Sequence, residues 1–181
     1  MRSARITFAI LAALRLGESA TLERLSLDEL IEKSTSVVRG RLYSPRAAFH
    51  GPVIYTRWTV QVIERWKGPE AQQLEVVVPG GVAMGLRQTF SGAPRLQEGG
   101  DYVLFLWTGR NGLTHVVGLS QGVFVVSKEM AGGETAWRAA STAAMVDPKS
   151  GSVVADAGVR LRLADLRARV AAVSRGAEQG R

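Results

Sequence analysis

The chain has no cysteine among its 181 residues. This absence excludes disulfides, thiolate metal sites and cysteine nucleophiles. Histidine is scarce as well: the two residues, His50 and His115, show no H-E-x-x-H or comparable spacing, so the sequence predicts no zinc centre. The glycines form neither a G-x-G-x-x-G nor a P-loop pattern, which removes the usual phosphate-binding loops. We therefore expect no metal and no cofactor.

Long apolar runs are also missing. The run Ile6–Leu14 has nine residues, whereas about 20 are needed to span a bilayer. Arg2 and Arg5 precede this run and small residues follow it near Ala20, an order typical of a secretory signal peptide. We expect residues 1–20 to be that signal, the protein to be periplasmic or extracellular, and the mature protein to have no transmembrane anchor. A retained amphipathic helix in a cytosolic protein is the alternative.

Negative charge is in short supply, which leaves the chain with a net charge of +7. The excess lies at the two ends: residues 1–20 carry a net +2 and residues 158–181 a net +4, so that +1 remains for residues 21–157. A body this close to neutral offers few phosphate contacts. The charge therefore argues against nucleic acid as a partner.

Two segments carry helix signals. Ser26 and Glu29 are spaced as a capping box, which predicts a short helix over 27–33 with Leu30 and Ile31 facing inward. Near the C-terminus, apolar residues recur at spacings of four and three, which predicts an amphipathic helix over 158–176, followed by a tail that frays up to residue 181. These apolar residues are Val159, Leu163, Leu166, Val170 and Val173.

Between the helices the sequence alternates with the period of β-strands. Ile54, Trp58 and Val60 share one face of the segment 53–68, which predicts that they are buried. The residues around Gly109 to Gly112 predict a hairpin turn, and 82–100 a long irregular connection. Further strands are expected over 36–44 with a bulge at Gly40, over 72–81, 101–107, 113–120 and 122–127, and at an edge over 134–142.

This pattern predicts a mainly β fold. We expect residues 21–157 to form one small antiparallel barrel of five to six strands, OB-like in arrangement, with the amphipathic helix and frayed tail over 158–181. A β-sandwich is the alternative.

The segment Gly118-Leu119-Ser120-Gln121-Gly122 has the G-x-S-x-G spelling of a hydrolase nucleophile elbow. An elbow requires a helix directly after the serine, but valine and phenylalanine alternate after Gly122, which favours a strand. We therefore expect Ser120 to lie within a sheet, the two glycines to kink it or allow a close backbone approach, and no residue to be catalytic. The alternative is a serine hydrolase in which Ser120 acts with His115 or His50.

Aromatic and basic side chains alternate along 55–66, where Tyr55, Arg57, Arg65 and Trp66 form the candidate binding surface. Barrels of the OB type bind single strands by stacking bases on such aromatics beside basic groups. This pattern leaves a second alternative open, a single-stranded nucleic-acid binder.

Five segments together resemble an uncharacterised family of exported bacterial proteins that typically carry a signal peptide. The resemblance covers about residues 25 to 127 and implies export, but no activity. The segments are LDELIEKSTSVVRGRL, IYTRWTVQVIERWKG, VPGG, GAPRLQEGGDYVLFL and VVGLSQGVFVV.

Three shorter motifs are similar to those of netrin/TIMP-like OB barrels: Val38-Arg39-Gly40, Lys67-Gly68, and Gly100 followed by Asp101-Tyr102-Val103-Leu104. Inhibitors of that class place an N-terminal cysteine amine on a protease zinc, which this cysteine-free chain cannot do. The sequence as a whole predicts a non-enzymatic, exported β-barrel module that binds an unidentified protein or cell-envelope component.

Overall fold

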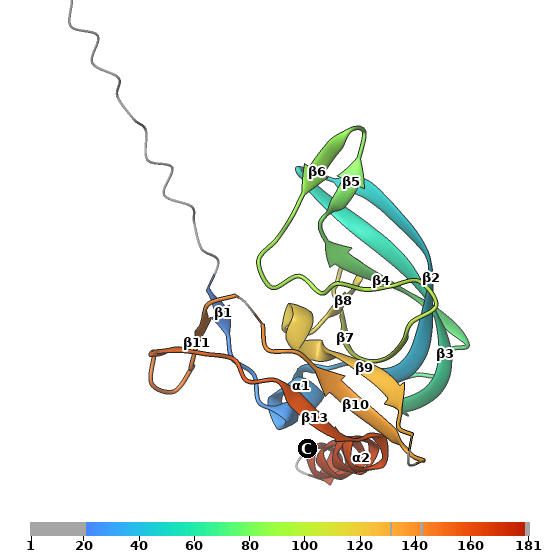
Figure 1. Ribbon diagram of the computed structural model, residues 1–181, viewed down its shortest axis with the longest axis vertical. Helices are drawn as coiled ribbons and strands as arrows, with labels where there is room; N and C mark the ends of the chain where they lie inside the picture. The colour runs from blue at the N-terminus through green and yellow to red at the C-terminus, as the bar shows by residue number, and fades with distance from the viewer. Residues whose placement is uncertain (1–20, 131, 142, 180–181) are drawn as a thin grey trace, which may run out of the picture.

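The computed structural model describes residues 21–130, 132–141 and 143–179, which form a mainly β structure with two α-helices (Figure 1). The predicted mainly β fold, with one helix near each end, is confirmed. The predicted signal peptide at 1–20 and the last two residues of the predicted tail lie outside the described residues.

The first helix, α1 (Leu27–Lys33), begins where the sequence predicts it. The backbone N–H of Ser26 donates to Glu29 Oε2 at 2.8 Å, and the backbone N–H of Glu29 donates to Ser26 Oγ at 3.3 Å. The Ser26 hydroxyl also donates to Glu29 Oε2, at 2.6 Å, and this bond together with that from the Ser26 backbone N–H holds the pKa of the Glu29 carboxyl below its usual value. Leu30 and Ile31 are buried, as expected from their spacing.

Three strands form a long antiparallel meander, β2 (Ser36–His50), β3 (Val53–Lys67) and β4 (Gln73–Pro79). The register of β2 against β3 shifts between Arg39 and Gly40, which confirms the predicted bulge. Ile54, Trp58 and Val60 of β3 are buried, as their alternation predicts.

Two further strands close a circuit with this meander. β7 (Asp101–Thr108) pairs with β2, and β8 (Thr114–Val116) pairs antiparallel with β7 and parallel with β4. The pairings therefore lead from β7 through β2, β3, β4 and β8 back to β7, and we call these strands the five-strand circuit. The sheet is mixed, so the prediction of a purely antiparallel sheet is wrong. The β4–β8 contact joins segments about 40 residues apart, which no local pattern encodes.

Three strands extend the sheet beyond β7, in the order β9 (Val123–Lys128), β10 (Glu134–Arg138) and β13 (Val159–Arg162). β10 pairs on both sides, so its predicted place at an edge is wrong. β13 occupies the edge and replaces the first turn of the helix predicted from residue 158. Its Val-Arg-Leu-Arg alternation fits the open side of β10.

The second helix, α2 (Leu163–Gln179), follows β13 directly. Leu166 and Val170 are buried in the same cluster as residues of the sheet, as their spacing predicts. The prediction that the chain frays after residue 176 is wrong for residues 177–179, because the helix continues to Gln179.

The predicted number of strands, five to six, was too low: the main sheet alone has eight strands, and further short strands occur in the connections. β5 (Gly81–Ala83) and β6 (Leu86–Gln88) form a hairpin inside the predicted irregular connection. β1 (Leu22–Glu23), β11 (Met145–Val146) and β12 (Val153–Val154) form a small separate sheet. One 3₁₀ turn, η1 (Leu119–Gly122), lies between β8 and β9.

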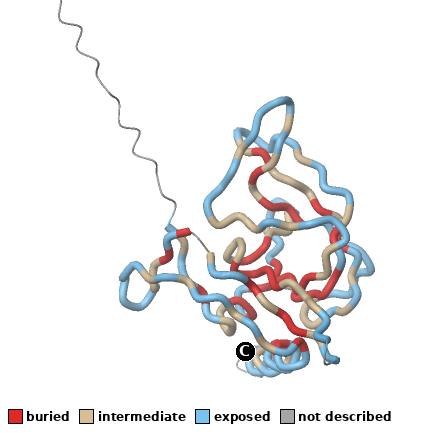
Figure 2. Tube along the Cα trace, viewed as in Figure 1, coloured by how far each residue is buried: buried red, intermediate tan, exposed pale blue. Residues whose placement is uncertain are grey.

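The buried residues, red in Figure 2, form two clusters, and the alternation of their members along β2 and β7 places the clusters on opposite faces of the main sheet. The inner cluster includes Trp58, Val76 and Leu104 of the five-strand circuit and Val123 of β9. The outer cluster, which includes Phe105 and Leu166, lies between the sheet and the two helices. The helices contact β7, β10, β13 and the end of β3 that carries Glu64 and Trp66, whereas β4, β8 and the part of β3 around Tyr55 and Arg57 lie away from them (Figure 1).

Candidate functional site

A row of side chains crosses the outer face of the sheet where it lies away from the helices. Trp107 of β7 lies opposite His115 of β8, and His115 lies beside Val77 of β4. Val77 pairs with Arg57 of β3, and Arg57 with Arg46 of β2. Residues paired across neighbouring strands point to the same face of a sheet. The row therefore has aromatic rings at one end and two guanidinium groups, the arginine pair Arg46 and Arg57, at the other.

Tyr55 and His50 extend the aromatic end. The Tyr55 ring lies edge-on to His115, with centroids 6.0 Å apart, and edge-on to His50 at 6.3 Å. The Trp107 and His115 rings are 6.1 Å apart and inclined by 30°. These distances are typical of interacting aromatic pairs. We call Trp107, His115, Tyr55 and His50 the aromatic row; it contains both histidines of the chain.

The aromatic row has an apolar floor and open rings. Val77 is only 2% exposed although it belongs to neither core cluster, so its neighbours in the row cover it from outside. Trp107 is 48% exposed, whereas Tyr55 and His115 are half-buried. Such a surface can stack a flat ligand ring without any rearrangement of the core.

The imidazole of His115 is suited to contact an uncharged ligand group. Burial lowers the pKa of its imidazole below the usual value of 6.5. At neutral pH the ring is therefore uncharged and can offer one N–H donor and one nitrogen acceptor.

The arginine pair gives the other end of the row a positive field. Arg57 Nη1 lies 2.5 Å from Glu75 Oε1 at the surface, where an ion pair contributes little stability. Arg46 is exposed and forms no ion pair with a carboxylate that the structure describes. Like charges opposed across two strands are destabilising, so an anionic or hydroxyl-rich ligand group would be favourable here.

The structure divides the predicted binding surface. Tyr55 and Arg57 belong to the site, but Arg65 lies at the far end of β3, where it donates to Gly68 O at 2.6 Å and pairs with Glu70 at 3.6 Å. Trp66 packs against the outer cluster under α2, away from the site, because two register shifts against β2 break the alternation of side chains near this end of β3. Its Nε1 donates to Glu64 Oε2 at 3.1 Å, and its ring lines a cavity of about 570 Å³ against α2.

The sequence did not indicate Trp107 as a site residue, because it ends the apolar segment 101–107. The hairpin turn predicted after it could have paired Trp107 with residues near His115. The further pairing of His115 with Val77 of β4 has no local signal.

Ser120 lies in the 3₁₀ turn η1, so the prediction that it lies within a sheet is wrong. The strand predicted after Gly122 is confirmed as β9, and no α-helix follows the serine. The Ser120 backbone N–H donates to Gly92 O at 2.9 Å, and its buried Oγ has no hydrogen-bond partner among the described residues. A serine without a base in reach lacks the geometry of an activated nucleophile.

We expect a fluorophosphonate probe to leave Ser120 unmodified, because its hydroxyl is buried and lacks a hydrogen-bonded imidazole. Mass spectrometry of the treated, folded protein measures this directly, with trypsin as the positive control for the probe. Stoichiometric labelling of Ser120 would establish the hydrolase alternative.

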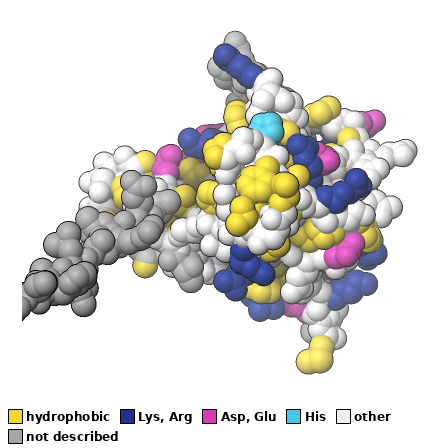
Figure 3. Space-filling view, turned by 90° about the horizontal axis from the view of Figure 1, so that it is seen from above, with side chains coloured by type: hydrophobic (Ala, Val, Ile, Leu, Met, Phe, Trp, Pro, Cys, Tyr) yellow, Lys and Arg dark blue, Asp and Glu magenta, His cyan; other side chains and the backbone are white. Residues whose placement is uncertain are grey.

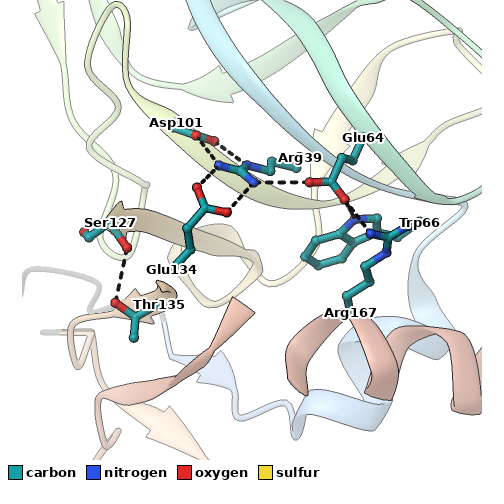
Figure 4. A network of polar contacts seen from close by, with 8 residues as sticks. All are labelled: Arg39, Glu64, Trp66, Asp101, Ser127, Glu134, Thr135 and Arg167. Atoms are coloured by element: carbon teal, nitrogen blue, oxygen red, sulfur yellow. Dashed lines mark hydrogen bonds and ion pairs between the residues drawn. The ribbon is translucent and has the colours of Figure 1, made fainter. Parts of the chain in front are cut away.

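The densest cluster of charge surrounds Arg39, which is buried with 11% of its side chain exposed. Its guanidinium donates to Asp101 at 3.2 and 2.8 Å, to Glu134 at 2.9 and 2.6 Å, and to Glu64 at 3.1 Å (Figure 4). These contacts raise the pKa of Arg39, and they lower that of the Glu134 carboxyl. Because all five N–H donors of Arg39 are used, this cluster joins strands and has no free donor for a ligand.

Glu64 extends the cluster to the C-terminal helix. Its Oε2 accepts from Trp66 Nε1 and lies 3.1 Å from Arg167 Nη1 of α2 (Figure 4). The cluster thus connects β2, β3, β7, β10 and α2. Its position and complete pairing indicate a structural role.

Among the described residues, no group of three or more histidine, aspartate or glutamate side chains is placed to hold a metal ion. No helix in the described part of the chain is long and apolar enough to cross a membrane. Family models, curated proteins and solved structures give no match to this chain. The resemblances of the sequence to an exported bacterial family and to netrin/TIMP-like barrels therefore remain predictions.

Proposed function

We propose that the protein is a non-enzymatic, exported binding module whose ligand lies along the aromatic row and the arginine pair. The observation that carries the proposal is the cross-strand row from Trp107 through His115 to Arg57 on a face that no helix covers. Export is supported by the signal-like pattern of residues 1–20 and by the resemblance to exported bacterial proteins.

The order of the strands supports the proposed OB-like barrel. β2, β3 and β4 form a meander, β7 and β8 a hairpin, and β4 runs parallel to β8 in the five-strand circuit. OB barrels bind ligands on the face of their second and third strands, between the loops that follow the first and fourth. Here those strands are β3 and β4, and the loops are 51–52 and 109–113. Tyr55 and Arg57 lie on that face.

We propose a polysaccharide of the cell envelope as the ligand. Aromatic rings stack on the apolar faces of sugars, and neighbouring polar groups can bond their hydroxyls. The row offers the neutral imidazole of His115 and the Arg57–Glu75 pair for this purpose. Five neighbouring strands span roughly 19 Å, which is room for several sugar units.

The arginine pair favours one second candidate, single-stranded nucleic acid. Bases would stack on Trp107 and Tyr55 while phosphates approach Arg46. The two candidates differ in location and salt dependence: the nucleic-acid binder requires a cytoplasmic protein and an affinity that falls steeply with salt, whereas the envelope module requires an exported one. Cell fractionation and titrations at two salt concentrations separate them.

We expect Trp107→Ala and Tyr55→Ala each to weaken binding of envelope glycan fragments about tenfold or more, since one stacked ring contributes roughly 1–3 kcal/mol. Isothermal titration calorimetry with purified peptidoglycan fragments, and with an oligo-dT strand in parallel, measures the effect. Ile63→Ala is the matched control, because Ile63 is an exposed apolar residue at the other end of β3. Glycan affinity that is unchanged in both aromatic variants, or absent in the wild type, would contradict the proposal.

A further inference from the structure

The β2–β3 turn and the β5–β6 hairpin form one end of the molecule (Figure 1). The Gln88 side chain joins them: its Oε1 accepts from Ile54 N at 2.6 Å, and its Nε2 donates to Pro52 O at 2.9 Å. The Gly80 backbone N–H adds a bond to Ile54 O at 2.7 Å. We call this end, residues 46–57 and 80–90, the hairpin end.

Large apolar side chains are exposed at the hairpin end. Nine large hydrophobic residues are exposed in the described chain, and five of them lie here. Figure 3 shows hydrophobic side chains at the centre of the face seen from above, with a histidine and several Lys or Arg side chains beside them. Clusters of this kind mark interaction surfaces on soluble domains. The five are Phe49, Val82, Met84, Leu86 and Phe90.

Met84 at the tip of the β5–β6 hairpin occupies an unfavourable conformation. Its φ is +49°, in the left-handed region where the two-residue hairpin turn favours asparagine or glycine. The side chain is 90% exposed, so no packing in the protein compensates for this strain. A strained, exposed apolar residue at a protruding tip indicates a contact made outside the chain.

The charge around this end is mostly basic, and Glu75, which pairs with Arg57, is an acidic side chain beside it. Positions 44–63 and 76–97 contain four arginines and one histidine, but no aspartate or glutamate. Arg87 lies on the hairpin itself, opposite Val82, and Arg46 lies on the adjoining β2 strand; both are exposed. An apolar tip with a basic rim is complementary to a membrane surface with anionic headgroups, which receives apolar side chains between the lipids.

We propose that the hairpin end docks on an anionic lipid membrane, with Met84 and Leu86 inserted among the lipids and Arg87 and Arg46 on the headgroups. The β5–β6 hairpin projects from the sheet (Figure 1), and Met84 and Leu86 at its tip are exposed, which favours a flat membrane over a protein groove. The hairpin end shares Arg46 and Arg57 with the arginine pair and His50 and Tyr55 with the aromatic row, but Met84, Leu86 and Arg87 lie outside that site. A docked module would hold that row next to the membrane.

Flotation of the full chain with vesicles tests the docking. We expect binding to vesicles of phosphatidylglycerol and phosphatidylethanolamine, little binding to phosphatidylcholine alone, and a decrease as salt rises. The double variant Met84→Ser, Leu86→Ser should lose about tenfold or more in vesicle affinity, and Arg87→Glu should lose a comparable factor. These positions are exposed, so the thermal midpoint should not change.

Met130→Ser is the matched control, since Met130 is a fully exposed methionine at the β9–β10 turn, and it should bind vesicles as the wild type does. Glycan binding should persist in the double variant, which separates this surface from the aromatic row. Vesicle binding that is undiminished in the double variant, or absent in the wild type, would overturn the proposal. So would a change in self-association alone, measured by light scattering, since it would assign the hairpin end to a second copy.

Discussion

Replacing Arg39 with methionine is expected to lower the free energy of unfolding by about 3–5 kcal/mol at neutral pH, because removing one partner of a buried ion pair leaves uncompensated charge. Arg39 donates all five of its hydrogen bonds to three carboxylates. Methionine fills a similar volume but leaves Asp101 and Glu134 without that partner. Urea unfolding followed by circular dichroism measures the loss, which corresponds to a decrease of roughly 10 °C in Tm.

Acid should reduce this difference between Arg39→Met and the wild type. Hydrogen bonds from Arg39 hold the pKa of the Glu134 carboxyl below its usual value. A carboxyl with a lowered folded pKa adds stability above its unfolded pKa, about 4.3, and loses it as the pH falls through the folded value. The variant lacks this contribution, and protonation relieves its unpaired carboxylates. The stabilities of the variant and the wild type should therefore approach each other as the pH falls below about 4.3.

Arg160→Met is the control for this experiment. Arg160 and Glu129 form an exposed pair at 3.4 Å, and surface pairs contribute at most about 1 kcal/mol. If Arg39→Met were as mild as Arg160→Met, the buried cluster would not stabilise the fold. A loss that does not change with pH would contradict the electrostatic explanation and indicate a packing defect instead.

The features that the sequence predicts correctly are encoded locally. The capping box at Ser26 and Glu29 lies within one helical turn, and the alternation that buries Trp58 lies within one strand. Where a local pattern fits two structures, the prediction was wrong. The spacing of four between Val159 and Leu163 suits a helix, but it also suits a strand followed by a helix, and the open side of β10 selects the second.

The site depends on contacts that the sequence cannot show. Tyr55 and Arg57 share a strand, so their pattern was visible, but their partners His115 and Trp107 come from a hairpin about 50 residues away. The same holds for Arg39, whose acceptors Glu64, Asp101 and Glu134 come from three other strands. From the sequence alone, a charged residue within a strand, such as Arg39, is predicted to be exposed. Only its partners on the other strands explain why it is buried.

The G-x-S-x-G spelling around Ser120 has a structural explanation in its two glycines. Gly118 has a φ of +63°, in the left-handed region that favours glycine. A Cβ at Gly122 would lie 2.3 Å from Val117 O and 2.9 Å from Val116 Cγ1. The predicted close backbone approach is therefore confirmed at Gly122, and the motif serves the tight turn from β8 into β9.

Gly122→Ala is accordingly expected to destabilise the protein by about 3 kcal/mol, at the upper end of the usual cost of overpacking, because the first contact is with backbone that no rotamer change can move away. The matched control is Gly176→Ala in α2, where a Cβ meets nothing within 4 Å and should add about 0.5–1 kcal/mol of stability. Ser120→Ala should be neutral or slightly stabilising, since it removes a buried hydroxyl without a partner. Urea unfolding of the three variants decides between the explanations. A large loss in Ser120→Ala together with a mild Gly122→Ala would show that the serine, and not the glycine, is the residue this turn requires.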